Sequence, residues 1–214
     1  MKRIICIIVL VLFPILMLCA CEKRTISEDK NKTESGIYPY EGLKYVVLED
    51  GTAEITGYSA DETVSSLIIP DYIAEGVKIS SIADDAFAGN DKLDYVEFPK
   101  YITKIGKNSF KDSSVRNIIM VSSRSLVEIG DGAFENCKRL VQADLPDSLK
   151  TIGKDAFVNC SSLVVVTFRG DMKNLNGEIF KGTGEFKICT YSDNDSVLAF
   201  ADKYGYDVQI LPRN

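Results

Sequence analysis

The chain contains no histidine and no tryptophan, and its basic residues are outnumbered by acidic ones. Without histidine it lacks the commonest general base and the commonest imidazole metal ligand. A Ser-His-Asp or Cys-His catalytic pair is therefore excluded within the chain. The formal net charge of −6 argues against a nucleic-acid partner, which needs a basic face. We expect a non-catalytic protein with no metal and no cofactor, and 214 residues allow about one or two domains.

The first 20 residues have the layout of an export signal. Lys2 and Arg3 precede an apolar stretch at 4–17, and small residues follow it. An uncleaved membrane anchor is an alternative, because residues 4–20 approach the roughly 20 apolar residues that span a bilayer. Ordinary secretion is a third possibility. Each of the three places the remainder of the chain outside the cytoplasm.

The segment Leu18-Cys19-Ala20-Cys21 resembles the lipobox of bacterial lipoproteins. The resemblance implies that Cys21 receives a diacylglycerol and becomes the mature N-terminus. Removal of residues 1–20 takes Lys2 and Arg3 and no acid, so the net charge falls from −6 to −8. An acidic body is not drawn to an anionic lipid surface. We therefore expect a cell-membrane protein that its lipid at Cys21 holds on the outer side.

Two short regions are expected between the export signal and the main domain. Residues 21–36 are polar and rich in both charges, which predicts a flexible tether. Its reach as a coil is on the order of 20 Å. Residues 37–63 are expected to form an N-terminal β cap. The cap contains a hairpin whose strands, Leu43–Glu49 and Thr52–Thr56, flank the tight-turn dipeptide Asp50-Gly51.

A phenylalanine then returns every 23 or 24 residues, from Phe87 through Phe110, Phe134 and Phe157 to Phe180. The first four end the same seven-residue phrase, for which Thr151–Phe157 (TIGKDAF) is an example. A fixed period of this length predicts a repeat solenoid, mainly of short strands with turns and short helical segments. We expect about five such repeats within residues 64–186.

Each repeat is expected to begin with a short strand. In the strand at Leu93–Phe98, period-2 alternation points Leu93, Val96 and Phe98 inward. Three of the strands end in proline, which cannot donate a ladder hydrogen bond and so stops the strand. The five expected strands are Val64–Ile69, Leu93–Phe98, Val115–Met120, Leu140–Leu145 and Leu163–Phe168.

The repeat resembles the BspA-type leucine-rich repeats of bacterial surface proteins, from residue 53 to about 211. The clearest copy is Leu140–Cys160 (LVQADLPDSLKTIGKDAFVNC). The last copy departs from the pattern, because Leu175–Phe180 has lost the usual glycine position and the alanine. The first copy carries about six extra residues between Pro70 and Ile82.

The remaining residues, 187–214, are expected to form a C-terminal cap. Ser192–Ser196 offers N-cap side chains, and the apolar residues that follow recur with helical spacing up to Gly205. A faint likeness of Ser192–Asp195 to a calcium loop lacks the required glycine and distant glutamate. The cap is therefore predicted to hold a short helix and a closing strand near Val208–Leu211.

Three cysteines fall within the repeats and the cap. Cys137 and Cys160 occupy the same phase of adjacent turns, at a spacing of about 5 Å that permits a disulfide. Buried thiols are the favoured interpretation, because small or polar residues hold the same position in other turns. A disulfide and a metal site are the alternatives. Cys189 falls at a position predicted to point inward, into the core.

The outward strand positions are where a functional surface would form, because stacked solenoid strands present an extended face. The alternative is an ordinary solvated sheet. The candidate binding residues are Ser66, Ile68, Tyr95, Glu97, Asn117, Ile119, Gln142, Asp144, Val165 and Thr167.

The resemblance implies a binding or adhesion module, whose partner is an extracellular protein or glycan, and we expect it to be a monomer. Two other functions remain open. One alternative is that the chain is a structural component of the cell envelope. The other is that it is a hydrolase that uses the carboxylates of Glu97 and Asp144. The hydrolase has little support, because two turns separate these residues by about 10 Å.

Overall fold

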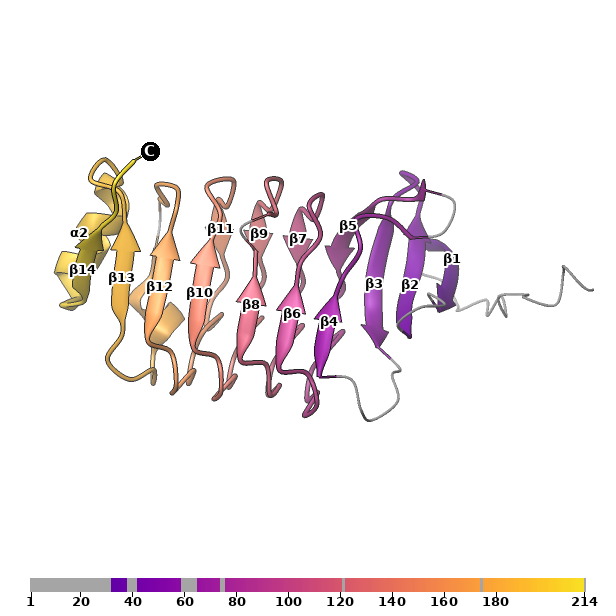
Figure 1. Ribbon diagram of the computed structural model, residues 1–214, viewed down its shortest axis with the longest axis horizontal. Coiled ribbons are helices and arrows are strands. Elements are labelled where there is room, and N and C mark those ends of the chain that lie inside the picture. Colours follow the sequence, from indigo (N-terminus) through magenta and orange to yellow (C-terminus); the bar gives the residue numbers. More distant parts are fainter. Residues whose placement is uncertain are drawn as a thin grey trace, which may run out of the picture.

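The computed structural model describes residues 32–37, 42–58, 65–73, 76–120, 122–173 and 175–213. Cys21, the export signal and the first part of the expected tether lie outside these residues. The described chain is an elongated solenoid in which successive turns stack side by side (Figure 1). The predicted fold class is confirmed.

One seven-stranded sheet contains all the strands that the sequence predicts for the repeats. Every pair of neighbours in it is parallel. We call it sheet B. Each of the five predicted repeat strands is shorter than predicted. In spatial order the strands are β14 (Asp207–Ile210), β13 (Lys187–Thr190), β12 (Val165–Phe168), β10 (Gln142–Leu145), β8 (Asn117–Ile119), β6 (Tyr95–Glu97) and β4 (Ser66–Ile68).

A second seven-stranded sheet, sheet A, was not predicted for the repeats. Its repeat strands precede the glycine of the Ile-Gly phrase, at residues for which no strand was predicted. Three of them are only two residues long, too short to show a strand period. In spatial order the strands are β1 (Lys32–Ile37), β2 (Leu43–Leu48), β3 (Ala53–Tyr58), β5 (Ile79–Ile82), β7 (Lys104–Ile105), β9 (Glu128–Ile129) and β11 (Thr151–Ile152).

The N-terminal end of sheet A is antiparallel. β2 and β3 form the hairpin expected around Asp50-Gly51, and Gly51 adopts the positive φ of 78° that the tight turn needs. β1 pairs with the far edge of β2, so a strand begins at Lys32, within the expected tether. The polar composition of this segment is compatible with a strand, because β2 supplies partners for its backbone hydrogen bonds.

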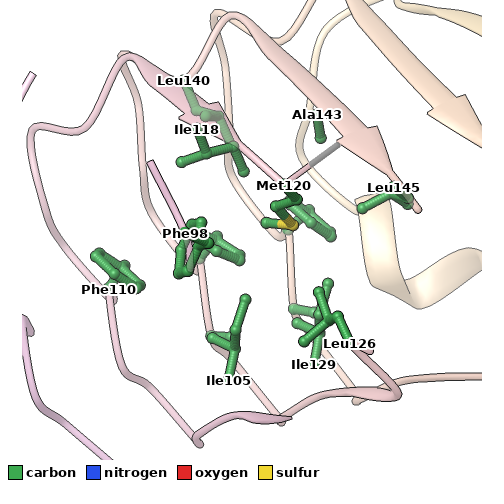
Figure 2. Close-up of a cluster of buried hydrophobic side chains, with 14 of the residues drawn as sticks. Phe98, Ile105, Phe110, Ile118, Met120, Leu126, Ile129, Leu140, Ala143 and Leu145 are labelled. Atoms are coloured by element: carbon green, nitrogen blue, oxygen red, sulfur yellow. The ribbon is translucent and has the colours of Figure 1, made fainter. Parts of the chain in front are cut away.

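The core lies between the two sheets. Leu93, Val96 and Phe98 are buried, as predicted. Figure 2 shows side chains of both sheets, such as Ile118 and Ile129, pointing into the same interior (Figure 2). The interior rows run along the solenoid because each strand pairs in register with its neighbour. Every turn therefore buries its apolar side chains against the turns before and after it.

The repeated phenylalanines form one continuous stack along the third side of the solenoid. Successive ring centroids lie 4.8, 5.3, 5.2 and 5.6 Å apart, with interplanar angles of 10° to 19°. Backbone hydrogen bonds join the same turns. For example, the N–H of Phe110 donates to the carbonyl of Ala133 at 2.8 Å. The residues two before and two after most of these rings have positive φ, such as Asn108 at 53° and Asn136 at 59°. Asparagine, aspartate and glycine tolerate that backbone, which explains their recurrence there.

The glycine of the Ile-Gly phrase is required by the close approach of adjacent turns. A Cβ on Gly106 would lie 2.6 Å from the carbonyl carbon of Ala83, and one on Gly130 would lie 2.7 Å from the nitrogen of Lys107. Contacts this short are excluded for any side chain. The glycines therefore set how tightly the turns stack.

The C-terminal cap contains helix α2 (Asp195–Tyr204) and the strand β14. The altered last copy forms a 3-10 helix, η2 (Gly177–Phe180), which still brings Phe180 onto the stack. The N-terminus of α2 is capped by a different residue than predicted. Asn194 is the N-cap residue but makes no capping bond, and Asp171 of the preceding turn accepts the N–H of Ser196 at 2.9 Å. No local pattern could predict this cap, because Asp171 lies 25 residues before Ser196 in the chain.

Candidate functional site

The ten candidate residues lie together on the outward face of sheet B, in two rows that cross the strands. The first row follows the register from Ser66 through Tyr95, Asn117 and Gln142 to Val165. The second contains Ile68, Glu97, Ile119, Asp144 and Thr167. Neighbouring strands are about 4.8 Å apart, so one partner can touch several turns at once. We call these ten residues the candidate binding face.

The face is only partly open to solvent. Ile68 is the most exposed apolar residue on it, at 54% of its full area, and Ser66 and Gln142 are exposed as well. The other seven residues are half-buried by their neighbours. None of the ten belongs to the buried core, so the fold leaves their identity free.

Two carboxylates on the face already have partners. Tyr95 donates its hydroxyl to Glu97 Oε2 at 3.0 Å. Burial raises the pKa of the Tyr95 phenol, and the bond to Glu97 adds to the rise. Arg169 donates to both oxygens of Asp144, from Nε at 2.7 Å and from Nη2 at 2.6 Å.

These contacts bear on the hydrolase alternative. Glu97 pairs with Ile119, and Asp144 continues the same row on the next strand, so the two carboxylates are two strand spacings apart, about 10 Å. Each is held by its own donor and not by the other. The geometry brings no acid–base pair together, and the absence of catalysis stays a prediction.

The outward rows continue beyond the residues that the sequence predicted. Lys187 and Asp207 extend the first row onto β13 and β14, and Cys189 and Gln209 extend the second. Cys189 is buried, as predicted, but the register places it on the outward side of the sheet. It pairs with Thr167 on the outward side, while Ile188 takes the inward position, because the register of β12 decides the alternation. Neighbouring side chains nevertheless leave Cys189 only 7% exposed.

Sheet A presents a second outward row that the sequence did not predict. Its members are Ser81, Lys104, Glu128 and Thr151, which pair in register. Lys104 Nζ lies 3.3 Å from Glu128 Oε1. The sequence did contain a sign of this row, because the residue before each Ile-Gly is polar. This row provides a comparison surface of similar construction.

The favoured interpretation of Cys137 and Cys160 is confirmed, because both are free and buried. Cys137 Sγ donates to the carbonyl of Phe110 at 3.0 Å, and Cys160 Sγ donates to that of Phe134 at 3.2 Å. Burial raises the pKa of the Cys137 thiol to about 11 and that of Cys160 further. Across the described parts of the chain, no group of three or more His, Cys, Asp or Glu side chains is placed to hold a metal.

Comparison with known proteins gives one family and several structures. A family model described as the BspA type leucine rich repeat region matches residues 58–187 in six copies. Six copies exceed the five expected. The comparison with curated proteins finds no match. Among the described residues, no helical segment combines the length and apolar character that a bilayer crossing requires.

The similar structures share the fold at low identity. The pneumococcal vaccine antigen PcpA is 18% identical with a TM-score of 0.58, covering 79% of this chain and 46% of that one. A leucine rich cell surface protein from Faecalibacterium prausnitzii is 21% identical with a TM-score of 0.52, covering 80% of this chain and 45% of that one. The leucine-rich repeat protein of T. pallidum is 23% identical with a TM-score of 0.50, covering 83% and 100%.

Proposed function

Because the chain belongs to the family of BspA type leucine-rich repeat proteins, we propose that it is a non-catalytic binding or adhesion module on the cell surface. In this proposal Cys21 carries the lipid that anchors the protein to the cell membrane. The candidate binding face contacts an extracellular protein or glycan. The neighbour described as a cell surface protein has the same fold.

The observation that carries the proposal is the separation of scaffold from surface. Inward ladders, the phenylalanine stack and the glycine contacts hold the fold, and none of them uses a residue of the candidate binding face. The ten outward side chains are thus fixed in two straight rows on a rigid sheet. A partner that binds such a preformed surface loses little free energy to ordering it.

The test is a triple substitution on the face. Tyr95→Ala, Asn117→Ala and Gln142→Ala together remove three adjacent side chains of the first row, and we expect the full-length protein to lose capture of its partner. The partner is sought by screening the protein against extracellular-matrix proteins and glycans. The matched control is the triple substitution Lys104→Ala, Glu128→Ala and Thr151→Ala on sheet A. Unchanged capture by the first variant, with both variants folded, would move the site elsewhere.

The anchor is tested separately. Cys21→Ala is expected to abolish incorporation of a labelled fatty acid and to release the protein from the membrane fraction. Cys19→Ala is the matched control, because it changes the neighbouring thiol and leaves the proposed lipidation site intact. A Cys21→Ala protein that is still acylated and membrane-bound contradicts the lipoprotein proposal.

A further inference from the structure

Two tyrosines occupy equivalent corners of the first two repeats. They stand third in the segments 70–73 (PDYI) and 99–102 (PKYI), which follow β4 and β6. The equivalent segment 146–149 (PDSL) has Ser148 in the same place. The fourth residue is buried in every case, so the core depends on that position and not on the tyrosine. The fold therefore accepts a small polar residue where Tyr72 and Tyr101 stand.

The two rings form one exposed platform. Their centroids are 5.5 Å apart at an interplanar angle of 62°. Tyr72 is 39% exposed and Tyr101 is half-buried. Aromatic rings at a surface offer an apolar face with a partial negative charge, against which the C–H groups of a ligand can pack. A pair of them set at an angle can hold a ligand from two sides.

Two lysines complete the cluster. Lys78 Nζ lies 5.1 Å and Lys100 Nζ 5.4 Å from the centroid of the Tyr101 ring. Both side chains are exposed, and neither forms an ion pair with any residue that the structure describes. The pKa of Tyr101 is lowered, first by the hydrogen bond to Tyr72 and then by the charge of Lys100, with a smaller effect of Lys78. Two ammonium groups therefore stand at this corner beside the single carboxylate of Asp71, in a chain whose net charge is −6.

The extra residues of the first repeat bring Lys78 to this corner. The chain turns back after Tyr72, so that Tyr72 and Lys78 form an antiparallel bridge. Ile73 N donates to Val77 O at 2.9 Å within the same turn. An inserted loop that is not needed to complete the solenoid is a common place for a binding function.

The corner is held in place by Asp71. Its Oδ1 accepts the backbone N–H of Lys100 at 2.7 Å, and its carbonyl accepts the N–H of Ile79 at 3.1 Å. These bonds tie the first repeat to the second and fix the distance between the two tyrosines. A site built in advance in this way binds without first ordering its own backbone.

We propose that Tyr72, Tyr101, Lys78 and Lys100, here called the Tyr-Lys corner, bind an acidic carbohydrate. The rings take the apolar face of a sugar, and the two ammonium groups take its carboxylate or sulfate. Lys78 and Lys100 are exposed, so an anion can reach their ammonium groups from the solvent. The Tyr-Lys corner lies outside the candidate binding face, so it does not depend on the function proposed for that face.

The test uses the full-length protein in detergent and four probes. A heparin oligosaccharide supplies sulfate, an oligogalacturonate supplies carboxylate, a dextran oligosaccharide is neutral, and polyglutamate is an acidic peptide. One variant combines Tyr72→Ser with Tyr101→Ser, because Ser148 holds the equivalent position in a later repeat. The other combines Lys78→Gln with Lys100→Gln. The matched control, Lys138→Gln with Lys173→Gln, makes the same change in charge at exposed sites elsewhere.

We expect titration calorimetry to show binding of at least one acidic oligosaccharide and at least tenfold weaker binding by each variant pair. The control should bind as the parent does, and the heparin and oligogalacturonate arms show which anion is preferred. Loss in the lysine pair alone, equal binding of polyglutamate, equal binding of dextran, or no binding of either acidic oligosaccharide would each overturn the proposal. If the serine pair does not fold, Tyr72→Ser alone replaces it, because that ring is at the surface.

Discussion

The phenylalanine stack predicts how much the substitution Phe134→Ala costs. Truncation of a buried phenylalanine costs about 3–5 kcal/mol in the free energy of unfolding. Phe134 is fully buried and lies between Phe110 at 5.3 Å and Phe157 at 5.2 Å. Each stacked pair contributes about 0.5–1.5 kcal/mol beyond area burial. We therefore expect a loss at the upper end, about 4–5 kcal/mol, against a total stability of about 5–15 kcal/mol.

Phe87→Ala provides the comparison. Phe87 is also buried, but among the residues that the structure describes it has one stacked neighbour, Phe110, at 4.8 Å. Its truncation removes one stacked pair where Phe134→Ala removes two, so it should cost about 1 kcal/mol less. Urea unfolding followed by far-UV circular dichroism measures both, and an unchanged slope with urea shows that the two transitions are comparable. A Phe134→Ala protein as stable as the parent, or one more stable than Phe87→Ala, would refute the reasoning.

Three further outcomes are expected from the same unfolding measurement. Gly130→Ala should cost about 1–3 kcal/mol because its Cβ would meet the preceding turn at 2.7 Å, whereas Gly184→Ala, with its nearest contact at 3.7 Å, should be close to neutral. Asn136→Ala should lower the free energy of unfolding by about 1–2 kcal/mol, because alanine is strained at a φ of 59°. Asn136→Gly should lower it less, because glycine adopts this φ without strain. Equal losses for the two variants would contradict this account. The pKa of Cys137, about 11 in the folded state, exceeds the value of about 8.5 for an exposed thiol. Ionisation therefore favours the unfolded chain, so stability should fall as the pH rises from about 8.5 towards 11, and less steeply in Cys137→Ala.

The repeat was predictable from the sequence because its signals are local and recur. The first four phenylalanines end the same seven-residue phrase, and the strands of sheet B alternate over enough residues to show a period of two. The repeat strands of sheet A were missed for the opposite reason. A strand such as Lys104–Ile105 has no pattern of its own and forms only because the turns on either side supply its partners.

The outward rows were also predictable, because alternation within a strand fixes which side chains leave the core. Contacts between turns were not. Asp144 and Arg169, which pair on the surface, are 25 residues apart in the sequence, and no local pattern predicts their contact. Cys189 was misplaced because its strand has few residues, so the neighbouring strand decides its register. The Tyr-Lys corner is visible only once the inserted loop is seen to return to Tyr72.

The in-register pairing of equivalent residues makes the turns interchangeable units of length. Ile129 stands beside Ile152, and Gly130 and Gly153 follow them in the same phase. Removing the whole span from Ile129 to Thr151 would rejoin Glu128 to Ile152 and leave each remaining turn with neighbours of the same kind. The molecule would become shorter by one strand spacing, about 4.8 Å. Gain or loss of one residue within a strand would instead shift the ladder, whereas the connections between strands absorb such a change, as the spacings of 23 and 24 residues show. The number of strands in each sheet can therefore change only by entire turns.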